Sequence, residues 1–458
     1  MSHQDFHARG VRLNSADLQA ALQWLFEGVD WSSIRFRAEC LWTAKWLAWA
    51  AILWAWSGET TLMERFACAQ RLICHLQKED RKASTSYQAF LKILRRWTNL
   101  LVQTIQVSLR NRMVTLSPEH WKIHGWIVFG VDGTKVDVPR THSNQQAYAP
   151  GRKSARAGKR NRRIKPHDPA ATKKTMQPQL WLTTLFHVGV HLPWDWRIGP
   201  ADSSERAHAL EMVPALPEGS LLTGDAGFVG YDFARSVLEN GCQLLVRVGS
   251  NVTLLKQLGF IRESQGTVYV WPDKASRREQ PPLVFRLVVV HGTRHPVYLI
   301  TSILSPSVLT DRQVAGLYRH RWGIEVFYRH LKQTFGRRKL RSHNAQNARV
   351  ELEWSLIGLW GIGLHASREL VLQGIPLERL SLAGALAAFR RVARDYLHPV
   401  DPQQTLRRQL RRALLDIYHR RNKSSRDYPR KKDERPAGIP VIKLATPLQI
   451  QIAKQLRT

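Results

Sequence analysis

Four residues near the middle of the chain have types and a spacing that suit chemistry on a phosphate: Tyr318, Arg321, Glu325 and Lys332. They lie in the stretch 318–336, which we predict as one continuous helix. Because a helix turns about 100° per residue, the three later side chains fall within roughly 60° of Tyr318, on one face. A carboxylate can hold a metal ion while basic groups hold phosphates. The pattern therefore predicts a metal-dependent reaction on a phosphate backbone.

The apolar residues of this stretch support the helix. They recur at helical spacing beside the charged face: Leu317, Ile324, Tyr328, Leu331 and Phe335. Thr310 or Asp311 is suited to cap its start, and Gly336 is suited to end it. The same features fit an amphipathic helix whose charged edge only faces solvent, and the helix by itself does not separate the two interpretations.

The spacing Tyr-x2-Arg-x3-Glu-x6-Lys resembles the YREK signature of the DDE transposases of bacterial insertion sequences, which are cut-and-paste enzymes with an RNase H-like core. Trp322, directly after the arginine, and Ile324, before the glutamate, also match the usual motif. The resemblance implies an α/β fold in which an RNase H-like catalytic core carries a β-rich insertion and is flanked by N-terminal and C-terminal helical regions. It also implies two aspartates upstream, each at the end of a core strand.

Asp132 is the candidate for the first aspartate. The apolar run 126–131 is rich in β-forming residues and predicts a buried strand that ends at Asp132. A carboxylate in such a place is costly unless it is paired or binds a metal. Asp132-Gly133 is also a common turn pair, so a capped hairpin turn is the alternative. Asp137 is a rival, which we interpret as a surface residue or a salt-bridge partner.

Asp225 is the candidate for the second aspartate. A short strand over 220–223 leads into Gly-Asp-Ala-Gly-Phe, and a helix is predicted over 231–240. The run Asp225-Ala-Gly-Phe228 resembles the Asp-x-Gly-aromatic context of the family. An aspartate that only caps a turn is the alternative. The order Asp132, Asp225, Glu325, each residue in its expected context, favours the catalytic interpretation.

The resemblance implies a metal-binding role for these three carboxylates. Asp132, Asp225 and Glu325 would bind magnesium or manganese, with two ions about 4 Å apart. Such ions activate a water or a 3′-hydroxyl and stabilise the leaving oxygen at the scissile phosphate. In the family, the freed 3′-hydroxyl attacks the opposite strand to form a hairpin, which is reopened before the element joins its target.

The resemblance also implies DNA-binding roles for the rest of the signature. Tyr318, Arg321 and Lys332 would hold the phosphate at the transposon end, and Arg321 can grip it with two hydrogen bonds. Trp322 would stack near the distorted DNA, or else it belongs to the core. Trp271 has the same two interpretations.

The charge of the chain agrees with a nucleic-acid partner. There are 69 Lys and Arg against 36 Asp and Glu, a formal net charge of +33. Such an excess predicts a polyanionic partner and salt-sensitive binding. The segment 151–174 is almost free of apolar residues and contains Arg160, Arg162 and Arg163. We interpret it as a basic arm along DNA phosphates, with a solvated loop as the alternative.

No segment predicts a membrane or a disulfide scaffold. The most apolar run, 41–56, is too short to span comfortably and contains Lys45, so we predict a buried core helix there. The first residues are polar and do not form a secretory signal. Four cysteines in 458 residues do not indicate a disulfide framework. We expect a cytoplasmic protein associated with the nucleoid.

The length predicts two or three domains. We expect a helical domain over 1–120 that binds end DNA, although its pattern fits a plain packing domain equally well. The RNase H-like core spans 121–360, with the insertion at about 245–305. A basic helical region over 361–458 would contact DNA or form a dimer interface. The expected helices lie at 18–26, 34–55, 62–76, 87–109, 345–372, 377–396 and 404–421, and the expected strands at 180–190, 192–198, 243–248, 267–271, 283–290 and 295–304.

The expected partners are double-stranded DNA, as terminal inverted repeats and target DNA, and a second copy of the chain on paired ends. Two other functions remain open: a catalytically silent DNA-binding regulator, and a host nuclease with the same core. Inverted repeats beside the gene would indicate a mobile element.

Overall fold

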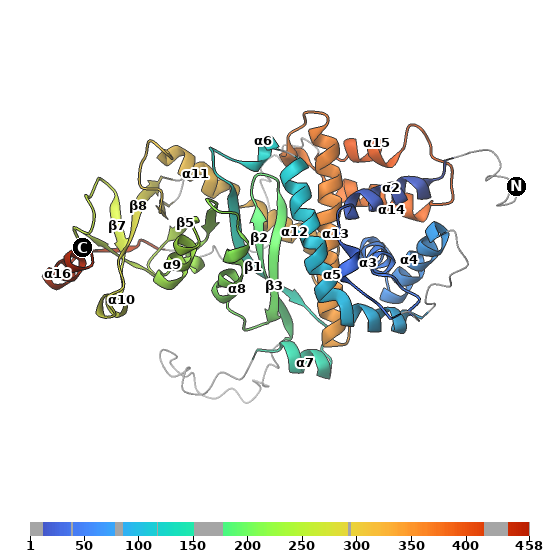
Figure 1. Ribbon diagram of the computed structural model, residues 1–458, viewed down its shortest axis with the longest axis horizontal. Helices are drawn as coiled ribbons and strands as arrows, with labels where there is room; N and C mark the ends of the chain where they lie inside the picture. The colour runs from blue at the N-terminus through green and yellow to red at the C-terminus, as the bar shows by residue number, and fades with distance from the viewer. Residues whose placement is uncertain are drawn as a thin grey trace, which may run out of the picture.

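The computed structural model describes residues 12–37, 40–77, 86–116, 118–150, 177–291, 295–415 and 438–457. A body of helices lies at one end of the molecule, and a sheet extends from it to the other end (Figure 1). The short elements are α6 (Pro118–Trp121), α7 (His142–Tyr148), α10 (Asp273–Arg277), η1 (Trp31–Ser33), η2 (Val213–Ala215), η3 (Ala226–Phe228) and η5 (Leu377–Arg379).

The helical body combines helices from both ends of the sequence: α2 (Asn14–Phe26), α3 (Ala44–Trp56), α4 (Leu62–Gln77), α5 (Tyr87–Leu116), α13 (Ala345–Val371), α14 (Leu382–Arg394) and α15 (Leu406–Arg411). The indole of Trp56 donates to the carbonyl of Gly358 at 2.9 Å, and that of Trp354 donates to Thr98 Oγ1 at 3.0 Å. The N-terminal and C-terminal helices therefore share one core.

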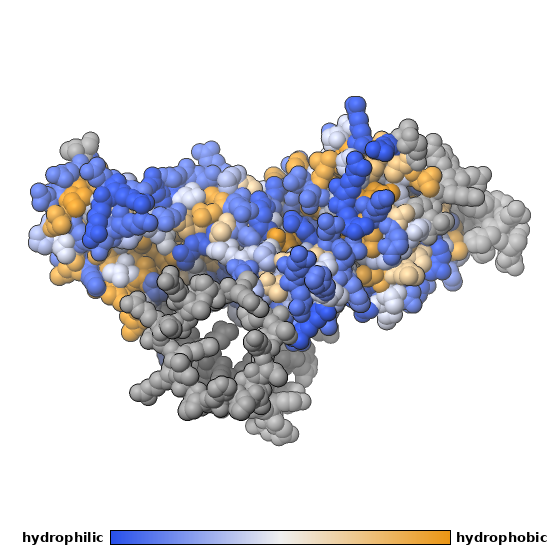
Figure 2. Space-filling model, turned by 90° about the horizontal axis from the view of Figure 1, so that it is seen from below, coloured by the Kyte–Doolittle hydropathy of each residue, from blue (hydrophilic) through white to orange (hydrophobic). Residues whose placement is uncertain are grey.

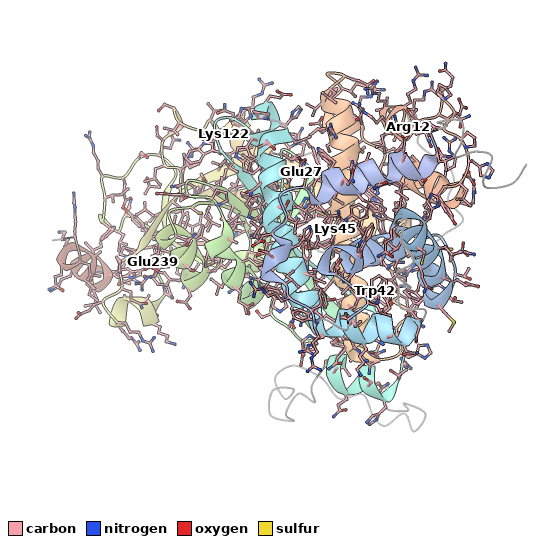
Figure 3. The ribbon with its side chains drawn as sticks, turned by 45° about the vertical axis from the view of Figure 1, so that its right-hand side comes forward. Arg12, Glu27, Trp42, Lys45, Lys122 and Glu239 are labelled. Carbon is pink, nitrogen blue, oxygen red and sulfur yellow. The ribbon has the colours of Figure 1, made fainter. Side chains whose placement is uncertain are left out.

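Helix α3 is the expected buried core helix. Nearly all of it is buried, and the ammonium of Lys45 lies 5.0 Å from the centre of the Trp49 ring; Figure 3 shows Lys45 on this helix within the helical body. Within the described residues, no helix is long and apolar enough to cross a membrane. The expected start at 34 is wrong, because α3 begins after Thr43, whose hydroxyl accepts the N–H of Trp46.

The core of the sheet has the arrangement expected of an RNase H-like fold. Its strands are β1 (Val128–Asp137), β2 (Gln179–His187), β3 (Leu192–Pro200), β4 (Leu221–Gly224) and β5 (Gln243–Val248). They lie in the order β3-β2-β1-β4-β5, and β2 runs antiparallel to the other four. Helices α8 (Glu205–Met212) and α9 (Tyr231–Glu239) make the connections from β3 to β4 and from β4 to β5. The α/β prediction is confirmed.

The expected insertion continues the same sheet. Strand β9 (Val297–Thr301) pairs with β5, and β8 (Leu283–Val290), β7 (Thr267–Val270) and β6 (Thr253–Lys256) follow outward. The interpretation of Trp271 as core is confirmed, since its side chain is buried and its indole donates to the carbonyl of Gln280 at 2.7 Å.

The last described segment lies far from the other C-terminal helices. Strand β10 (Val441–Leu444) pairs in parallel with β6 at the outer edge of the sheet, and α16 (Pro447–Gln455) follows it (Figure 1). Residues 361–458 thus do not form one helical region. The expected helix 404–421 also ends early, at Arg411. Figure 2 shows hydrophobic patches at this far end of the molecule, where Ile439, Leu444 and Leu448 are exposed.

Candidate active site

The predicted helix of the signature is interrupted. Helix α11 (Asp311–His320) is followed by a tight turn at Arg321-Trp322, then by α12 (Gly323–Arg329) and a π-helical turn, η4 (His330–Thr334). The prediction of one continuous helix is wrong, because apolar periodicity persists across such local changes of hydrogen bonding. Both ends are as expected. Thr310 caps α11 in a capping box, and Gly336 has a φ of +66° just beyond η4.

Arg321 links the signature to the first aspartate. Its Nη2 lies 3.1 Å from Glu325 Oε1, and its Nη1 lies 3.9 Å from Asp132 Oδ2. The guanidinium carbon lies 5.5 Å from the centre of the Tyr318 ring. Burial raises the pKa of the Tyr318 phenol, so it stays a neutral hydrogen-bonding group. Three of the four signature residues therefore meet beside Asp132.

Lys332 reaches β1 at a different point. Its Nζ donates to Thr134 Oγ1 at 2.6 Å, two residues beyond Asp132 along the strand. Burial lowers the pKa of this ammonium, and attraction to Asp137 opposes the change. The signature residues thus do not form one cluster: Arg321 lies beside Asp132, whereas Lys332 contacts Thr134, two residues further along β1.

Asp132 lies within β1 and not at its end. The strand runs on to Asp137, so the hairpin alternative is excluded. The parallel pairing with β4 nevertheless stops at Gly130, and Asp132 lies just past that point, opposite Thr184 of β2. The phenol of Tyr328 donates to the Asp132 carbonyl at 2.6 Å and fixes the strand to α12.

The surroundings of Asp132 disfavour the negative charge of its carboxylate, because the side chain is largely buried. Burial raises its pKa to about 6. A hydrogen bond from the Gly133 N–H, 2.8 Å long, and the attraction of Arg321 oppose that rise, while repulsion by Asp225 and Glu325 adds to it. Asp225 and Glu325 are therefore both close enough to affect Asp132.

Asp225 follows β4 directly, as expected. Its carboxylate accepts the N–H of Gly227 at 2.7 Å and so caps η3. The alternative that Asp225 caps the turn is thus confirmed. The cap uses Oδ1, so the other carboxylate oxygen does not take part in it. The turn is fixed from two sides: Arg206 donates to the Gly227 carbonyl at 2.7 Å, and Asn251 donates to the Ala226 carbonyl at 2.8 Å.

A fourth acid, Glu205, lies at this site and was not predicted. A Cβ added at Gly133 would come within 2.5 Å of Glu205 Oε1, so the glutamate lies beside β1 next to Asp132. Burial raises the pKa of Glu205 to about 7, repulsion by Asp132 and Asp225 adds to the rise, and Lys135 opposes it. A glutamate after a serine N-cap is an ordinary helix start, so its sequence signal is weak.

The acids present oxygen donors, which suit magnesium or manganese. Among the described residues, no three or more His, Cys, Asp or Glu side chains lie close enough together to hold a metal ion. The electrostatics explain this spread, since Arg321 attracts Asp132 and Glu325 while the carboxylates repel one another. The carboxylate oxygens are of the type that a hard divalent cation prefers, and the lack of a Cβ at Gly133 leaves the space that Glu205 Oε1 occupies beside Asp132.

Trp322 is exposed beside the signature. Its side chain is 58% exposed, so the interpretation as a core residue is wrong. With Tyr318 and Arg321 it lines a cavity of about 320 Å³ whose other walls include Val290 and Leu299. Arg160, Arg162 and Arg163 lie outside the described residues.

Comparison with known proteins decides the family. A family model described as "Transposase DDE domain" matches residues 127–360, just over half of the chain. The chain belongs to the DDE transposases. The matched region of this DDE transposase begins one residue before β1 and ends inside α13, and it contains all four acids described above.

Two relatives extend the comparison. Transposase InsG for insertion sequence element IS4, from Escherichia coli (strain K12), is 23% identical over 251 residues. The match covers 53% of this chain and 51% of that protein, so the DDE transposase spans about half the length of this curated relative. A cryo-EM structure of the piggyBac transposase synaptic complex with hairpin DNA is similar with 11% identity and a TM-score of 0.38, over 92% of this chain and 89% of that one. A TM-score of this size does not establish a common fold.

Proposed function

We propose that this DDE transposase moves an insertion sequence by metal-dependent cut-and-paste transposition: it cleaves strands at terminal inverted repeats and transfers them into target DNA. The observation that carries the proposal is the meeting of Asp132, Asp225 and Glu325: repulsion by Asp225 and by Glu325 adds to the raised pKa of Asp132. That meeting joins segments nearly 200 residues apart, at the edge where β1 and β4 stop pairing. The family membership and the net charge of +33 support it.

Asp132, Asp225 and Glu325 are the residues that would hold two magnesium or manganese ions. Such ions supply activation of a water or 3′-hydroxyl and stabilisation of the leaving oxygen. Arg321 keeps the side chains of Asp132 and Glu325 turned toward each other before DNA arrives. The raised pKa of Asp132 means that a bound cation would favour loss of its proton.

The DNA phosphate at the element end would be held by Tyr318, Arg321 and Lys332. Arg321 presents a planar fork of donors, which matches a phosphate better than a point charge does. The exposed Trp322 offers a ring on which a base can stack. We also assign the segment with Arg160, Arg162 and Arg163 to the DNA backbone, on charge alone.

We propose a division of labour along the chain. Helices within 1–120 would bind end DNA, the core over 121–360 would carry the reaction, and 361–458 would contact DNA or the partner. The active species would be a homodimer on paired ends, in the cytoplasm on nucleoid DNA. Membership of the YREK class stays a prediction.

The test is strand cleavage of a labelled duplex that carries the element's terminal repeat. Wild type and Glu325→Gln are compared, each with magnesium and with EDTA. We expect a cut at the repeat boundary that requires both the metal and Glu325. Tight binding without cleavage by either protein would support the silent regulator, and cleavage that ignores the repeat would support the nuclease.

A further inference from the structure

The turn between β5 and β6, residues 249–252 (the β5–β6 turn), lies beside the turn that carries Asp225 (the Asp225 turn, 225–228). Strands β4 and β5 pair in parallel, so their carboxyl ends meet at one edge of the sheet. Each of the two turns follows one of these strands. The side-chain amide of Asn251 donates to the Ala226 carbonyl at 2.8 Å, so the two turns are in direct contact.

The C-terminal segment, residues 438–457, contacts the same β5–β6 turn. A Cβ added at Gly438 would lie 3.0 Å from Ser250 Oγ, so the backbone passes close to this side chain. Gly438 has a φ of +78°, a conformation that favours glycine. Where β10 begins, the N–H of Val441 donates to the Val252 carbonyl at 3.2 Å. The β5–β6 turn therefore contacts both the C-terminal segment and the Asp225 turn.

Strand β6, which follows the β5–β6 turn directly, depends on β10 for most of its pairing. It pairs with β10 along its whole length, from Thr253 to Lys256, whereas its pairing with β7 is limited to Leu255 and Tyr269. Ala453 of α16 is fully buried, so the C-terminal segment also packs on the insertion. The order of the β5–β6 turn thus depends on whether this segment is in place.

We propose that the C-terminal segment positions Asp225, with Asn251 as the link between them. The segment orders β6 and the β5–β6 turn, and that turn holds the carbonyl of the residue after the aspartate. Asn251 is a positioning residue, because it acts on the Asp225 carboxylate only through the Asp225 turn. The consequence for catalysis rests on the proposed function, whereas the link itself belongs to the metal-free protein.

The experiment is hydrogen–deuterium exchange, read by mass spectrometry, on the metal-free, full-length protein. The N–H groups of Gly227 and Phe228 donate to Asp225, at 2.7 Å to Oδ1 and at 3.1 Å to its carbonyl. Exchange in the peptide 225–229 therefore reports on the order of the Asp225 turn. Asn251→Ala removes one hydrogen bond that holds this turn, so exchange there should become about threefold to tenfold faster.

Asn240→Ala is the matched control. The amide of Asn240 makes a bond of the same kind, to the Val213 carbonyl at 3.1 Å, at the far end of α9. Its loss should leave exchange over 225–229 unchanged. Circular dichroism on every variant verifies the fold.

Two variants of the C-terminal segment test the other half of the link. Val441→Pro keeps the chain length and removes the N–H that donates to Val252. Gly438→Ala adds a methyl group that presses on Ser250. Both should speed exchange over 225–229, and neither should add to the effect of Asn251→Ala, because all three act through one link.

Two results overturn the proposal. One is unchanged exchange over 225–229 in Asn251→Ala, or in both variants of the C-terminal segment. The other is a combined variant, Asn251→Ala with Val441→Pro, whose effect equals the sum of the single effects, since the segment would then act by another route.

Cleavage of repeat DNA gives the second readout. Every carboxylate is retained in Asn251→Ala and Val441→Pro, so the Mn²⁺ concentration for half-maximal cleavage should rise several-fold while the rate at saturating Mn²⁺ stays within about twofold. A wild type that leaves repeat DNA uncut, with the expected changes in exchange, refutes the transposition proposal and keeps the link. A wild type that cuts, with unchanged exchange in the variants, refutes only the link. Faster exchange with an unchanged Mn²⁺ requirement refutes the consequence for catalysis.

Discussion

Replacing Asp132 by asparagine should stabilise the metal-free protein at neutral pH. The pKa of Asp132 is about 6 against the usual 3.8, first because of burial. The folded protein therefore binds this proton more tightly than the unfolded chain does. The contribution to stability is complete below about pH 3.8 and is lost as the pH rises through about 6.

The size of the effect follows from the shift. Each pKa unit corresponds to about 1.4 kcal/mol. The rise from 3.8 to about 6 therefore means that the ionised Asp132 lowers the free energy of unfolding by about 3 kcal/mol above pH 6. Asparagine is neutral at every pH and can still accept the Gly133 N–H. Its gain should thus approach about 3 kcal/mol near neutral pH and vanish near pH 4.

Urea unfolding in EDTA measures this directly, at about pH 7.5 and at about pH 4.5, for wild type and Asp132→Asn. Asp273→Asn is the control, since that aspartate is exposed on α10, and we expect it to change the free energy of unfolding by less than about 0.5 kcal/mol. If Asp132→Asn is no more stable at the higher pH, or gains equally at both, Arg321 already compensates the charge and the reasoning is refuted. Mn²⁺ should stabilise the wild type more than the variant.

Four further substitutions test the rest of the structure. Arg321→Lys removes the planar fork between the acids, so cleavage of repeat DNA should fall by about tenfold or more, while circular dichroism stays unchanged; full activity would contradict the role given to the fork. Arg337→Met should lower the free energy of unfolding by about 3 kcal/mol in urea, because this buried guanidinium donates to the carbonyls of Phe335 and Ala55 and to Ser355; a loss below about 1 kcal/mol would show that the contacts are dispensable. Trp271→Ala should cost about 3 to 5 kcal/mol of stability. Trp322→Ala should leave stability nearly unchanged and weaken binding to repeat DNA, as measured by fluorescence anisotropy. A large loss of stability in Trp322→Ala, with weaker DNA binding only in Trp271→Ala, would show that Trp322 is the core residue and Trp271 the DNA contact.

The sequence predicts those elements whose signal is local. Strands β5 and β8 are found with their correct ends because apolar β-forming runs are bounded by turns. Asp132 and Asp225 are predicted as site residues because each follows a run of hydrophobic residues, although β1 continues past Asp132. The break at Arg321 is not found, because both sides of it keep the same apolar spacing.

Other features depend on partners distant in the chain. Strand β10 has four exposed residues and acquires its identity only by pairing with β6, nearly 190 residues earlier. Glu205 is an ordinary first residue of a helix until α8 packs on β2 and faces Asp132. Whether β1 ends near Asp132 also depends on which neighbouring strand is considered. The pairing of β1 with β2 continues past Asp132, whereas its pairing with β4 stops at Gly130.

The position of β10 at the sheet edge means that a part of the chain synthesised late covers an edge strand formed much earlier in the sequence. Strand β6 keeps an open row of backbone donors and acceptors until residues 441–444 have been synthesised, because β10 covers that edge. An open edge is a template for pairing with any other extended chain. At the stage when the sheet has formed and β10 has not yet been added, β6 is therefore an open edge that can pair with another chain. Chains cut short before β10 remain in that stage and are the ones most prone to aggregate.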